Sequence, residues 1–400
     1  MREKVELLAP AGNLEKLKIA VLYGADAVFI GGKKFSLRAK ASNFELSDIK
    51  EGVEFAHKHG SKVYITVNIY PRNEDLEGLE EYLLELDKIG VDAIIVSSLH
   101  IIDTARKLGC KFEVHVSTQQ SVANTSSIEF FKKAGAERIV LARELTLDQI
   151  EELRNNTDVA LEVFIHGGMC AAFSGRCVLS NNMANRDANR GGCAHSCRWH
   201  YDLVDKGEKI SEEDFLFASK DLMSINYIKD LIRIGVNSLK IEGRMKSHHY
   251  IATVVSLYRK LIDEIYESDY QISNNRLLDY EQEMSRFENR AMGSGFFGGD
   301  VTHEGQIFEN ESKQPNQDFI AFVVSYDKEN RRALIKTRNY FTSNIEVETL
   351  SPGGITRKFN LGDIYTLEGE KIEISNTPDK LYYINVDFEL AEHSIIRKLS

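Results

Sequence analysis

A seven-residue pattern recurs four times along this chain of 400 residues. The copies read GADAVFI from Gly24, GVDAIIV from Gly90, GAERIVL from Gly135 and GVNSLKI from Gly235. Each has a glycine, a small residue, an acidic or amide residue, one further residue and three that are mostly apolar. Each also follows a stretch with helical periodicity, such as LEKLKIAVLY. A glycine that ends a helix and turns the chain directly into a buried strand explains the pattern, which predicts a parallel sheet.

Eight apolar segments are candidates for the strands of that sheet. They are VELLA from Val5, AVFI from Ala27, KVYITV from Lys62, AIIV from Ala93, FEVHV from Phe112, RIVLA from Arg138, LEVFI from Leu161 and SLKI from Ser238. Eight parallel strands separated by helices close into a (β/α)8 barrel, which is the fold that we predict for this α/β chain. FLFAS from Phe215 is a ninth candidate. An open doubly wound sheet is the alternative, but no G-x-G-x-x-G pattern follows the first strand.

The alternation of helices and strands fades at about residue 265, and short strands such as FIAFVVSY, RRALIKT and LYYINV follow Gln317. These strands are typical of a small antiparallel β-barrel. We therefore expect a barrel domain over residues 1–265, with a cysteine-rich insertion at 166–200. A helical and glycine-rich connector is expected at 266–316, and a small β-barrel domain at 317–400.

The composition, with 42% apolar and 28% charged residues, is typical of a soluble globular protein. No apolar run reaches the length of about 18 residues that a membrane span needs, so no membrane partner is expected. The start, MREKVELLAPAG, lacks the apolar core of a signal peptide, and we expect a cytoplasmic location with reduced thiols. The net charge of −11 argues against non-specific nucleic-acid binding, unless basic residues are concentrated in one place.

Four of the five cysteines lie within 28 residues, in the spacing C-x6-C-x15-C-x3-C. They are Cys170, Cys177, Cys193 and Cys197. Where thiols stay reduced, such clustering is typical of metal binding or catalysis rather than of disulfides. Four thiolates suit either a structural zinc ion or an iron–sulfur cluster, and the wide spacing favours the cluster. Cys110 stands apart, and we expect it in the core.

The cysteine-rich segment begins where the seventh strand ends, and the active sites of (β/α)8 barrels form at the carboxyl ends of the strands. The segment is also locally basic, with Arg176, Arg186, Arg190 and Arg198 against the single acidic residue Asp187. The strand ends are expected to form a polar rim of Pro10, Gly12, Gly31, Gly32, Asn68, Ser97, His115, Ser117, Arg143, His166, Glu242 and Arg244. Each residue alone is explained by a cap or a loop hydrogen bond. Together with the cysteines, they make this face the candidate site.

Signatures of common hydrolases are missing, since the chain has no G-x-S-x-G, no H-E-x-x-H and no P-loop. A thiol protease stays open as an alternative, because His166 and His195 lie close in sequence to cysteines. Four clustered cysteines nevertheless exceed what such an enzyme needs. A non-enzymatic scaffold or partner subunit is a third alternative.

Several motifs resemble peptidase family U32, whose members have been described as collagenase-like. They are EVFIHGGMCAAFSGRCVLS (Glu162 to Ser180), NRDANRGGCAHSCRWHY (Asn185 to Tyr201), ELLAPAGNLEKLKIAVLYGADAVFIGG near the N-terminus and SLKIEGRMKSHHY (Ser238 to Tyr250). The C-terminal strands are similar too, so the resemblance covers nearly the whole chain. It is strongest to the branch of prephenate-dependent tRNA hydroxylases. NRAMGSGFFGG from Asn289 is looser than the corresponding run of that branch.

The resemblance implies that the chain hydroxylates the wobble uridine in a tRNA anticodon loop to 5-hydroxyuridine, with prephenate as the oxygen donor. It also implies that the four clustered cysteines hold a 4Fe–4S cluster, for which zinc is the alternative, and that a related U32 subunit is a candidate partner. A U32-type peptidase that uses a thiol or a metal is the alternative function.

Particular residues are expected to bind the substrates or take part in the chemistry. Prephenate carries two carboxylates, which an arginine binds in a bidentate way, and Arg143, Arg190, Arg198 and Arg244 are the candidates. Trp199, Tyr201 and Phe173 are candidates for stacking on the splayed base. His166, Glu242 and Arg244 are the candidate catalytic residues.

Overall fold

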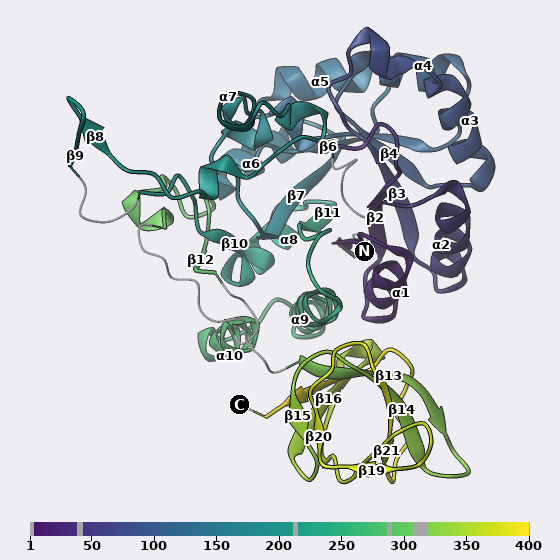
Figure 1. The fold of residues 1–400 in the computed structure, drawn as a ribbon. Coiled ribbons are helices and arrows are strands. Elements are labelled where there is room, and N and C mark those ends of the chain that lie inside the picture. The colour runs from purple at the N-terminus through teal and green to yellow at the C-terminus, as the bar shows by residue number, and fades with distance from the viewer. Residues whose placement is uncertain (1–3, 38–42, 211–214, 286–289, 308–318, 400) are drawn as a thin grey trace. The chain divides into compact units, whose positions relative to one another are not determined.

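A computed structural model describes residues 4–37, 43–210, 215–285, 290–307 and 319–399 (Figure 1). The chain forms two compact units. The first contains Ala25–Lys246, the residues that precede Leu22 and a stretch that starts at Arg290. The second contains Leu22–Gly24, a segment from Ser247 that carries two helices, and the C-terminal strands. The domain boundaries expected at residues 265 and 316 stay predictions, and the second of them lies outside the described residues.

Eight parallel strands of the first unit close into a barrel. They are β1 (Glu6–Pro10), β2 (Ala27–Gly31), β3 (Lys62–Val67), β4 (Ala93–Val96), β5 (Glu113–Val116), β6 (Arg138–Val140), β7 (Ala160–Gly167) and β11 (Ser238–Ile241). The first seven pair in chain order, and β11 closes the ring because it pairs in parallel with both β1 and β7. These are the eight predicted segments, so the predicted (β/α)8 barrel is confirmed.

Helices follow the first six strands and lie on the outer side of the barrel (Figure 1). They are α1 (Leu14–Leu22), α2 (Leu46–Lys58), α3 (Leu79–Ile89), α4 (Leu99–Lys107), α5 (Thr125–Lys133) and α6 (Leu147–Asn155), and α8 (Ile228–Ile234) precedes β11. Each buries one apolar stripe, as α3 does with Leu79, Leu83 and Leu86, spaced four and three residues apart. None of the helices in the described part of the chain has the length and apolar character needed to cross a membrane.

The four-copy pattern has the predicted backbone conformation. Its glycines have positive φ angles, which are 106° at Gly24, 87° at Gly90, 99° at Gly135 and 93° at Gly235. A strand begins three residues after each of them. Because a residue with a Cβ rarely adopts this conformation, the glycine is what allows the helix to end and the strand to start so soon.

The acidic or amide residue of each copy connects two neighbouring strands. Its side chain accepts the N–H of a residue near the start of the adjacent odd-numbered strand: Asp26 from Leu7 at 2.7 Å, Asp92 from Val63 at 2.7 Å, Glu137 from Val114 at 2.7 Å and Asn237 from Leu161 at 2.9 Å. Its own N–H donates to the carbonyl oxygen of that same residue. The pattern therefore needs a side-chain oxygen at this position, which explains the choice of Asp, Glu or Asn.

Charged side chains occupy part of the barrel interior. Glu162 is fully buried, and its carboxylate accepts hydrogen bonds from Lys240 Nζ at 2.7 Å and from Arg138 Nη1 at 3.2 Å. Arg138 also pairs with Glu6. Burial alone would raise the pKa of Glu162, but Lys240 and Arg138 outweigh that effect and lower it to about 2. The interior therefore holds a compensated chain of charges in place of purely aliphatic layers.

His115 lies in this interior and not on the rim where we expected it. Its side chain is fully buried, with Nε2 2.9 Å from the Glu113 carboxylate and its ring edge against Tyr64. Side chains alternate along a strand, so a residue near a strand end points inward as readily as it joins the rim. Burial lowers the pKa of His115, and the hydrogen bond with Glu113 opposes this shift.

The ninth strand candidate is not part of the barrel. Residues 215–219 form only isolated pairings, from Phe215 to Tyr201 and from Ser219 to Gln306. The sheet is instead extended beyond the barrel by β10 (Asp221–Met223), which pairs antiparallel to β7, and by β12 (Met292–Gly293). A hairpin of β8 (Val204–Asp205) and β9 (Glu208–Lys209) precedes them.

The second unit contains an antiparallel sheet and two helices, α9 (His248–Glu267) and α10 (Asn274–Ser285). The strand order is β17-β16-β22-β13-β14-β21-β18-β19, and the sheet curls around an apolar core (Figure 1). The bounds are β13 (Phe319–Asp327), β14 (Arg332–Thr337), β16 (Glu346–Ser351), β17 (Ile355–Asn360), β18 (Ile364–Tyr365), β19 (Lys371–Ile372), β21 (Leu381–Asn385) and β22 (Ile395–Lys398), with a separate pair of β15 (Phe341–Thr342) and β20 (Ile374–Ser375). The predicted antiparallel domain is thus confirmed.

Candidate functional site

The cysteine-rich loop leaves the barrel at the carboxyl end of β7. Gly167 has a φ of 102°, and a Cβ there would lie 2.5 Å from the carbonyl oxygen of Glu242. Only glycine lets β7 end this close to the chain that follows β11. The loop then forms four short helices: η3 (Phe173–Gly175), α7 (Leu179–Ala184), η4 (Ala188–Arg190) and η5 (Ser196–Arg198).

The four clustered cysteines lie in one region of this loop and form no disulfide. Cys193 is exposed, while Cys170, Cys177 and Cys197 are half-buried. Burial raises the pKa of the Cys197 thiol, and the three other cysteines of the loop raise it further, against the opposing effect of Arg198. The four thiols are therefore close enough to influence one another's ionisation.

The donor set of the loop fits an iron–sulfur cluster. The N–H of Leu179 points at Cys177 Sγ from 3.3 Å, a contact of the kind that tunes cluster sulfurs. Yet no three His, Cys, Asp or Glu side chains in the described ranges form a site for a single metal ion. A zinc ion draws its thiolates to about 2.3 Å, whereas a 4Fe–4S cluster takes one thiolate at each of four separated corners. Four thiols gathered in one loop supply the donors that either group needs.

Asn189 attaches Cys177 to the rim of the barrel. Its side-chain amide donates to the carbonyl oxygen of Cys177 at 2.9 Å and accepts the N–H of the same residue at 3.4 Å. Its backbone carbonyl accepts the N–H of Tyr70, just past the end of β3, at 3.0 Å. The backbone of Cys177 is thus held at a fixed place above β3.

A second attachment joins the loop to the chain that follows β6. Arg143 Nη1 donates to the carbonyl oxygen of Gly168 at 3.1 Å, and its guanidinium lies 5.1 Å from the centre of the Phe164 ring. The Glu144 carboxylate accepts the N–H of Ser174 at 2.6 Å and also its hydroxyl. Ser174 is fully buried and has a φ of 47°, a conformation that surrounding contacts must hold. These contacts fix the stretch that contains Cys170.

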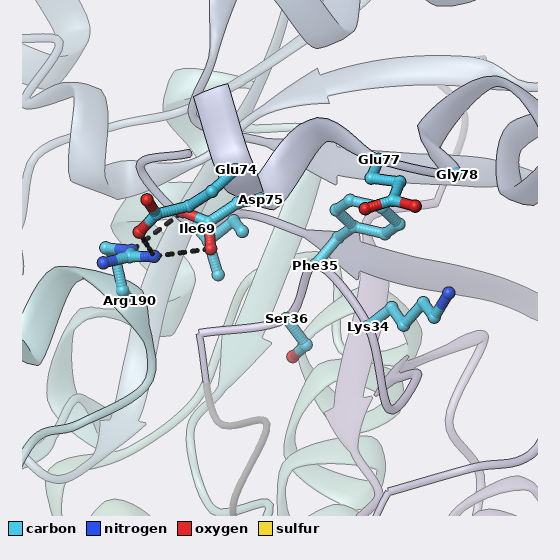
Figure 2. Close-up of a pocket in the computed structure, with 9 residues that line it drawn as sticks. All are labelled: Lys34, Phe35, Ser36, Ile69, Glu74, Asp75, Glu77, Gly78 and Arg190. Carbon is cyan, nitrogen blue, oxygen red and sulfur yellow. Dashed lines mark hydrogen bonds and ion pairs between the residues drawn. The ribbon is translucent and has the colours of Figure 1, made fainter. Parts of the chain in front are cut away.

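Arg190 makes the third attachment, at one wall of a pocket (Figure 2). Its guanidinium donates to Asp75 at 2.6 and 2.8 Å and to Glu74 at 2.9 Å, both in η1 (Asn73–Leu76). The hydrogen bond from Arg190 lowers the pKa of Asp75. The pocket has a volume of about 600 Å³ and is lined by Lys34, Phe35, Ser36, Ile69, Glu74, Asp75, Glu77, Gly78 and Arg190.

A buried glutamine joins three of the predicted rim residues. Gln119 Oε1 accepts hydrogen bonds from Asn68 and Ser97 at 3.1 Å and lies 3.4 Å from the hydroxyl of Ser117. Its Nε2 is buried and has no hydrogen-bond partner among the residues described. A Cβ at Gly175 would lie within 4 Å of both Gln119 and Arg143, so these two side chains flank the same point.

The three candidate catalytic residues lie at neighbouring strand ends. His166 is buried in β7, and its carbonyl oxygen accepts the N–H of the half-buried Glu242 at 2.8 Å. Arg244 is buried beside β2 and β3, where it donates to the hydroxyls of Ser36 and Thr66 at 3.0 and 3.1 Å. The three residues therefore share one end of the barrel, and their chemical roles stay predictions.

Arg198 and the aromatic candidates differ in their contacts and exposure. Arg198 Nη2 is 3.4 Å from the carbonyl oxygen of Met169 and 3.8 Å from the carboxylate of Asp221. Trp199 is 39% exposed and Phe173 is 54% exposed, so both rings are accessible. Tyr201 instead packs its ring edge against Phe217.

Several residues of the site could not be identified from the sequence alone. Asn189, Glu144 and Gln119 contact residues 12 to 51 positions away, and nothing in their local pattern marks these contacts. Asn189 lies in NNMANRDANR, where it is one of several asparagines. The pocket residues Lys34 and Glu77 lie two residues beyond Gly32 and nine residues beyond Asn68, the positions that we read as strand ends.

Comparison with known proteins gives two family matches and several relatives with different names. A family model described as "Peptidase family U32" matches residues 12–307, and one described as "Peptidase family U32 C-terminal domain" matches residues 315–397. The "tRNA hydroxylation protein P1" of Bacillus subtilis is 44% identical over 405 residues, which cover 99% of this chain and 95% of the relative.

Two further relatives have other names. The "23S rRNA 5-hydroxycytidine C2501 synthase" of Escherichia coli is 40% identical over 265 residues, which cover 66% of this chain and 40% of the relative. The "Collagenase" of Porphyromonas gingivalis is 32% identical over 309 residues, which cover 74% of this chain and 73% of the relative.

Proposed function

The chain belongs to peptidase family U32, and we propose that it hydroxylates RNA, converting the wobble uridine of a tRNA anticodon loop to 5-hydroxyuridine. The name of the B. subtilis relative, which is similar over nearly the whole length, supports tRNA as the substrate, and the E. coli synthase supports hydroxylation of a pyrimidine at carbon 5. The observation that carries the proposal is the loop of four thiols at the carboxyl end of the barrel, next to a pocket of about 600 Å³.

We assign Cys170, Cys177, Cys193 and Cys197 as the ligands of a 4Fe–4S cluster. Hydroxylation of a uracil ring needs redox chemistry that ordinary side chains do not supply, and such a cluster supplies it when bound. The chain itself contributes the fixed backbone of Cys177 and the N–H directed at its sulfur. These contacts orient the ligands from outside the cluster.

The oxygen donor is proposed to be prephenate, bound through its carboxylates. Of the four candidate arginines, Arg190 has its charge compensated by Glu74 and Asp75. Arg143 donates to a backbone carbonyl, and its guanidinium and the side chain of Gln119 both lie within 4 Å of the point where a Cβ at Gly175 would stand. The buried Nε2 of Gln119 has no acceptor among the described residues. An incoming carboxylate would satisfy both groups, so Arg143 with Gln119 is the preferred site.

Anaerobic purification with iron and acid-labile sulfide analysis tests the cluster. We expect both at about four per chain, the content of one 4Fe–4S cluster, with loss in Cys193→Ser and retention in the control Cys110→Ser. Stoichiometric zinc without sulfide would overturn the cluster assignment.

The activity is tested separately by incubating the purified holoenzyme with unmodified tRNA and prephenate. Mass spectrometry of the tRNA nucleosides should then detect 5-hydroxyuridine with wild type and none with Cys193→Ser. Cleavage of gelatin by a protein that leaves the tRNA unchanged would favour the peptidase alternative, which the name of the P. gingivalis relative suggests.

A further inference from the structure

We propose that the pocket of Figure 2 receives the target pyrimidine base, turned out of its RNA strand, and that Lys34 and Glu77 bind the polar edge of that base. The inference rests on the proposed RNA hydroxylation and names the place where its substrate base sits. The volume of about 600 Å³ lies within the range of about 300–1,000 Å³ that is typical of small-molecule sites.

The charges of the lining decide between the two proposed substrates. Glu74, Asp75 and Glu77 oppose Lys34 and Arg190, so the lining is more negative than positive. Glu74 and Asp75 are engaged by Arg190, as the dashed lines of Figure 2 mark. A dicarboxylate would meet net repulsion here, whereas a neutral base would not. The pocket therefore suits the base rather than the oxygen donor.

The ammonium group of Lys34 and the carboxylate of Glu77 are the two opposite charges of the lining that a ligand can bind. Lys34 and Glu77 make no ion pair within the part of the chain that the structure describes, although both line the pocket. The edge of uracil presents carbonyl oxygens on either side of an N–H. An ammonium group binds a carbonyl oxygen and a carboxylate accepts the N–H, so the pair matches this edge.

Two largely buried apolar side chains form part of the pocket wall. Phe35 and Ile69 line it, and the Ile69 N–H donates to the Phe35 carbonyl oxygen at 3.2 Å. Phe35 has a φ of 60°, and Tyr82 supports its ring from a centroid distance of 5.4 Å. A bulky residue held in this conformation points to a local role for it, which is to shape the wall of the pocket.

The pocket is also connected to the cysteines. Arg190 of the pocket wall directly follows Asn189, which holds the backbone of Cys177. The base and the thiols are therefore positioned by one segment at the same end of the barrel.

The test uses an RNA stem-loop of 17 nucleotides with 5-fluorouridine at the wobble position, followed by ¹⁹F NMR and by fluorescence anisotropy for affinity. Fluorine blocks reaction at carbon 5, so the readout does not depend on catalysis. With the wild-type holoenzyme we expect a shifted ¹⁹F resonance. Lys34→Gln and Glu77→Gln should each weaken binding about ten-fold and abolish the shifted resonance. The neighbouring Lys33→Gln and Glu80→Gln, whose parent residues do not line the pocket, are matched controls and should behave as wild type.

The outcomes separate this inference from the proposed function. RNA that binds without a shifted resonance, or a shift that survives in both pocket variants, overturns the pocket assignment and leaves RNA hydroxylation standing. Failure of the wild type to bind the stem-loop or tRNA at all overturns RNA hydroxylation and the pocket assignment with it.

Discussion

The side-chain amide of Asn189 forms two hydrogen bonds with the backbone of Cys177, one to its carbonyl oxygen at 2.9 Å and one from its N–H at 3.4 Å. The same asparagine accepts a hydrogen bond from Tyr70 at the end of β3. A proposed cluster ligand is thus held by a residue that is not a ligand. Contacts of this kind orient metal ligands and are costly to lose.

Replacement of Asn189 by alanine should therefore weaken cluster retention. We expect the affinity of the loop for iron to fall about 10–100-fold, because Cys177 loses its fixed position. Iron and labile sulfide per chain, measured after anaerobic dialysis against a chelator, report this loss. Asn182→Ala, at an exposed position of α7, is the control and should retain the wild-type content. Equal retention in both variants would show that Asn189 does not position the ligand.

Replacement of Arg143 by glutamine should weaken binding of prephenate, the proposed oxygen donor. Loss of a charge-assisted hydrogen bond costs about 1.5–3 kcal/mol, which corresponds to roughly 10–100-fold in affinity. Calorimetric titration with prephenate measures the change. Arg190→Gln is the comparison and should have a smaller effect, because Glu74 and Asp75 already neutralise that guanidinium. The reverse order of the two variants would assign the carboxylate site to Arg190.

Replacement of Glu162 by glutamine should destabilise the barrel strongly. The substitution leaves Lys240 buried without its carboxylate partner, and breaking a buried pair in this way costs about 3–5 kcal/mol. Denaturant unfolding of the full chain, followed through a spectroscopic signal from the first unit, measures the loss. Glu152→Gln, on the exposed face of α6, should leave the unfolding free energy unchanged.

The same carboxylate predicts how stability depends on pH. Its pKa is lowered from an ordinary 4.5 to about 2 in the folded chain. A lowered carboxyl pKa contributes stability that is complete above the unfolded value and is lost as the pH falls through the folded value. Wild type should thus lose about 3 kcal/mol between pH 4.5 and 2 through this group. The unfolding free energy of Glu162→Gln should therefore fall less steeply than that of wild type as the pH is lowered over this range. An identical pH dependence in the two proteins would contradict the lowered pKa of Glu162.

Replacement of Arg397 by methionine should destabilise the second unit. Arg397 is 4% exposed and bridges Glu348 and Glu283, both at 2.6 Å. Without it, Glu348 keeps a buried and uncompensated charge, so we expect a loss of about 3 kcal/mol. Thermal unfolding of Arg397→Met, of Glu348→Gln and of the double variant measures the coupling. If the double variant is no more stable than Arg397→Met, the buried charge is not the cause.

The barrel could be predicted because its strongest signals are local. A glycine followed by an acidic or amide residue and an apolar run marks the end of a helix and the start of a strand within seven residues. FLFAS has the same apolar character, yet residues 215–219 form only isolated pairings, because pairing depends on a free neighbouring strand as well as on composition. His115 was misplaced for a similar reason, since the end of β5 does not reveal which way its side chains point.

The candidate site could be predicted only in part. The cysteines stand out because the chain uses so few of them, and their position after β7 follows from the barrel. The residues that hold them do not stand out, since Glu144 meets Ser174 and Arg190 meets Asp75 only after folding, across 30 and 115 positions of sequence. The sequence also does not reveal that two carboxylates neutralise the charge of Arg190. This neutralisation changes which arginine suits an anionic ligand.

The paired hydrogen bonds of Asp26, Asp92, Glu137 and Asn237 recur at every second strand. At its amino end the barrel therefore has approximate fourfold rotational symmetry, built from four quarters that are joined in the same way. The opposite end has no such symmetry, because only one quarter carries the cysteine loop. In barrels of this kind the amino end serves stability and the carboxyl end serves chemistry. The hydrogen bonds at the amino end are thus independent of the loops at the carboxyl end. A quarter of the barrel can therefore acquire a new loop without changing its hydrogen bonds to the neighbouring quarters.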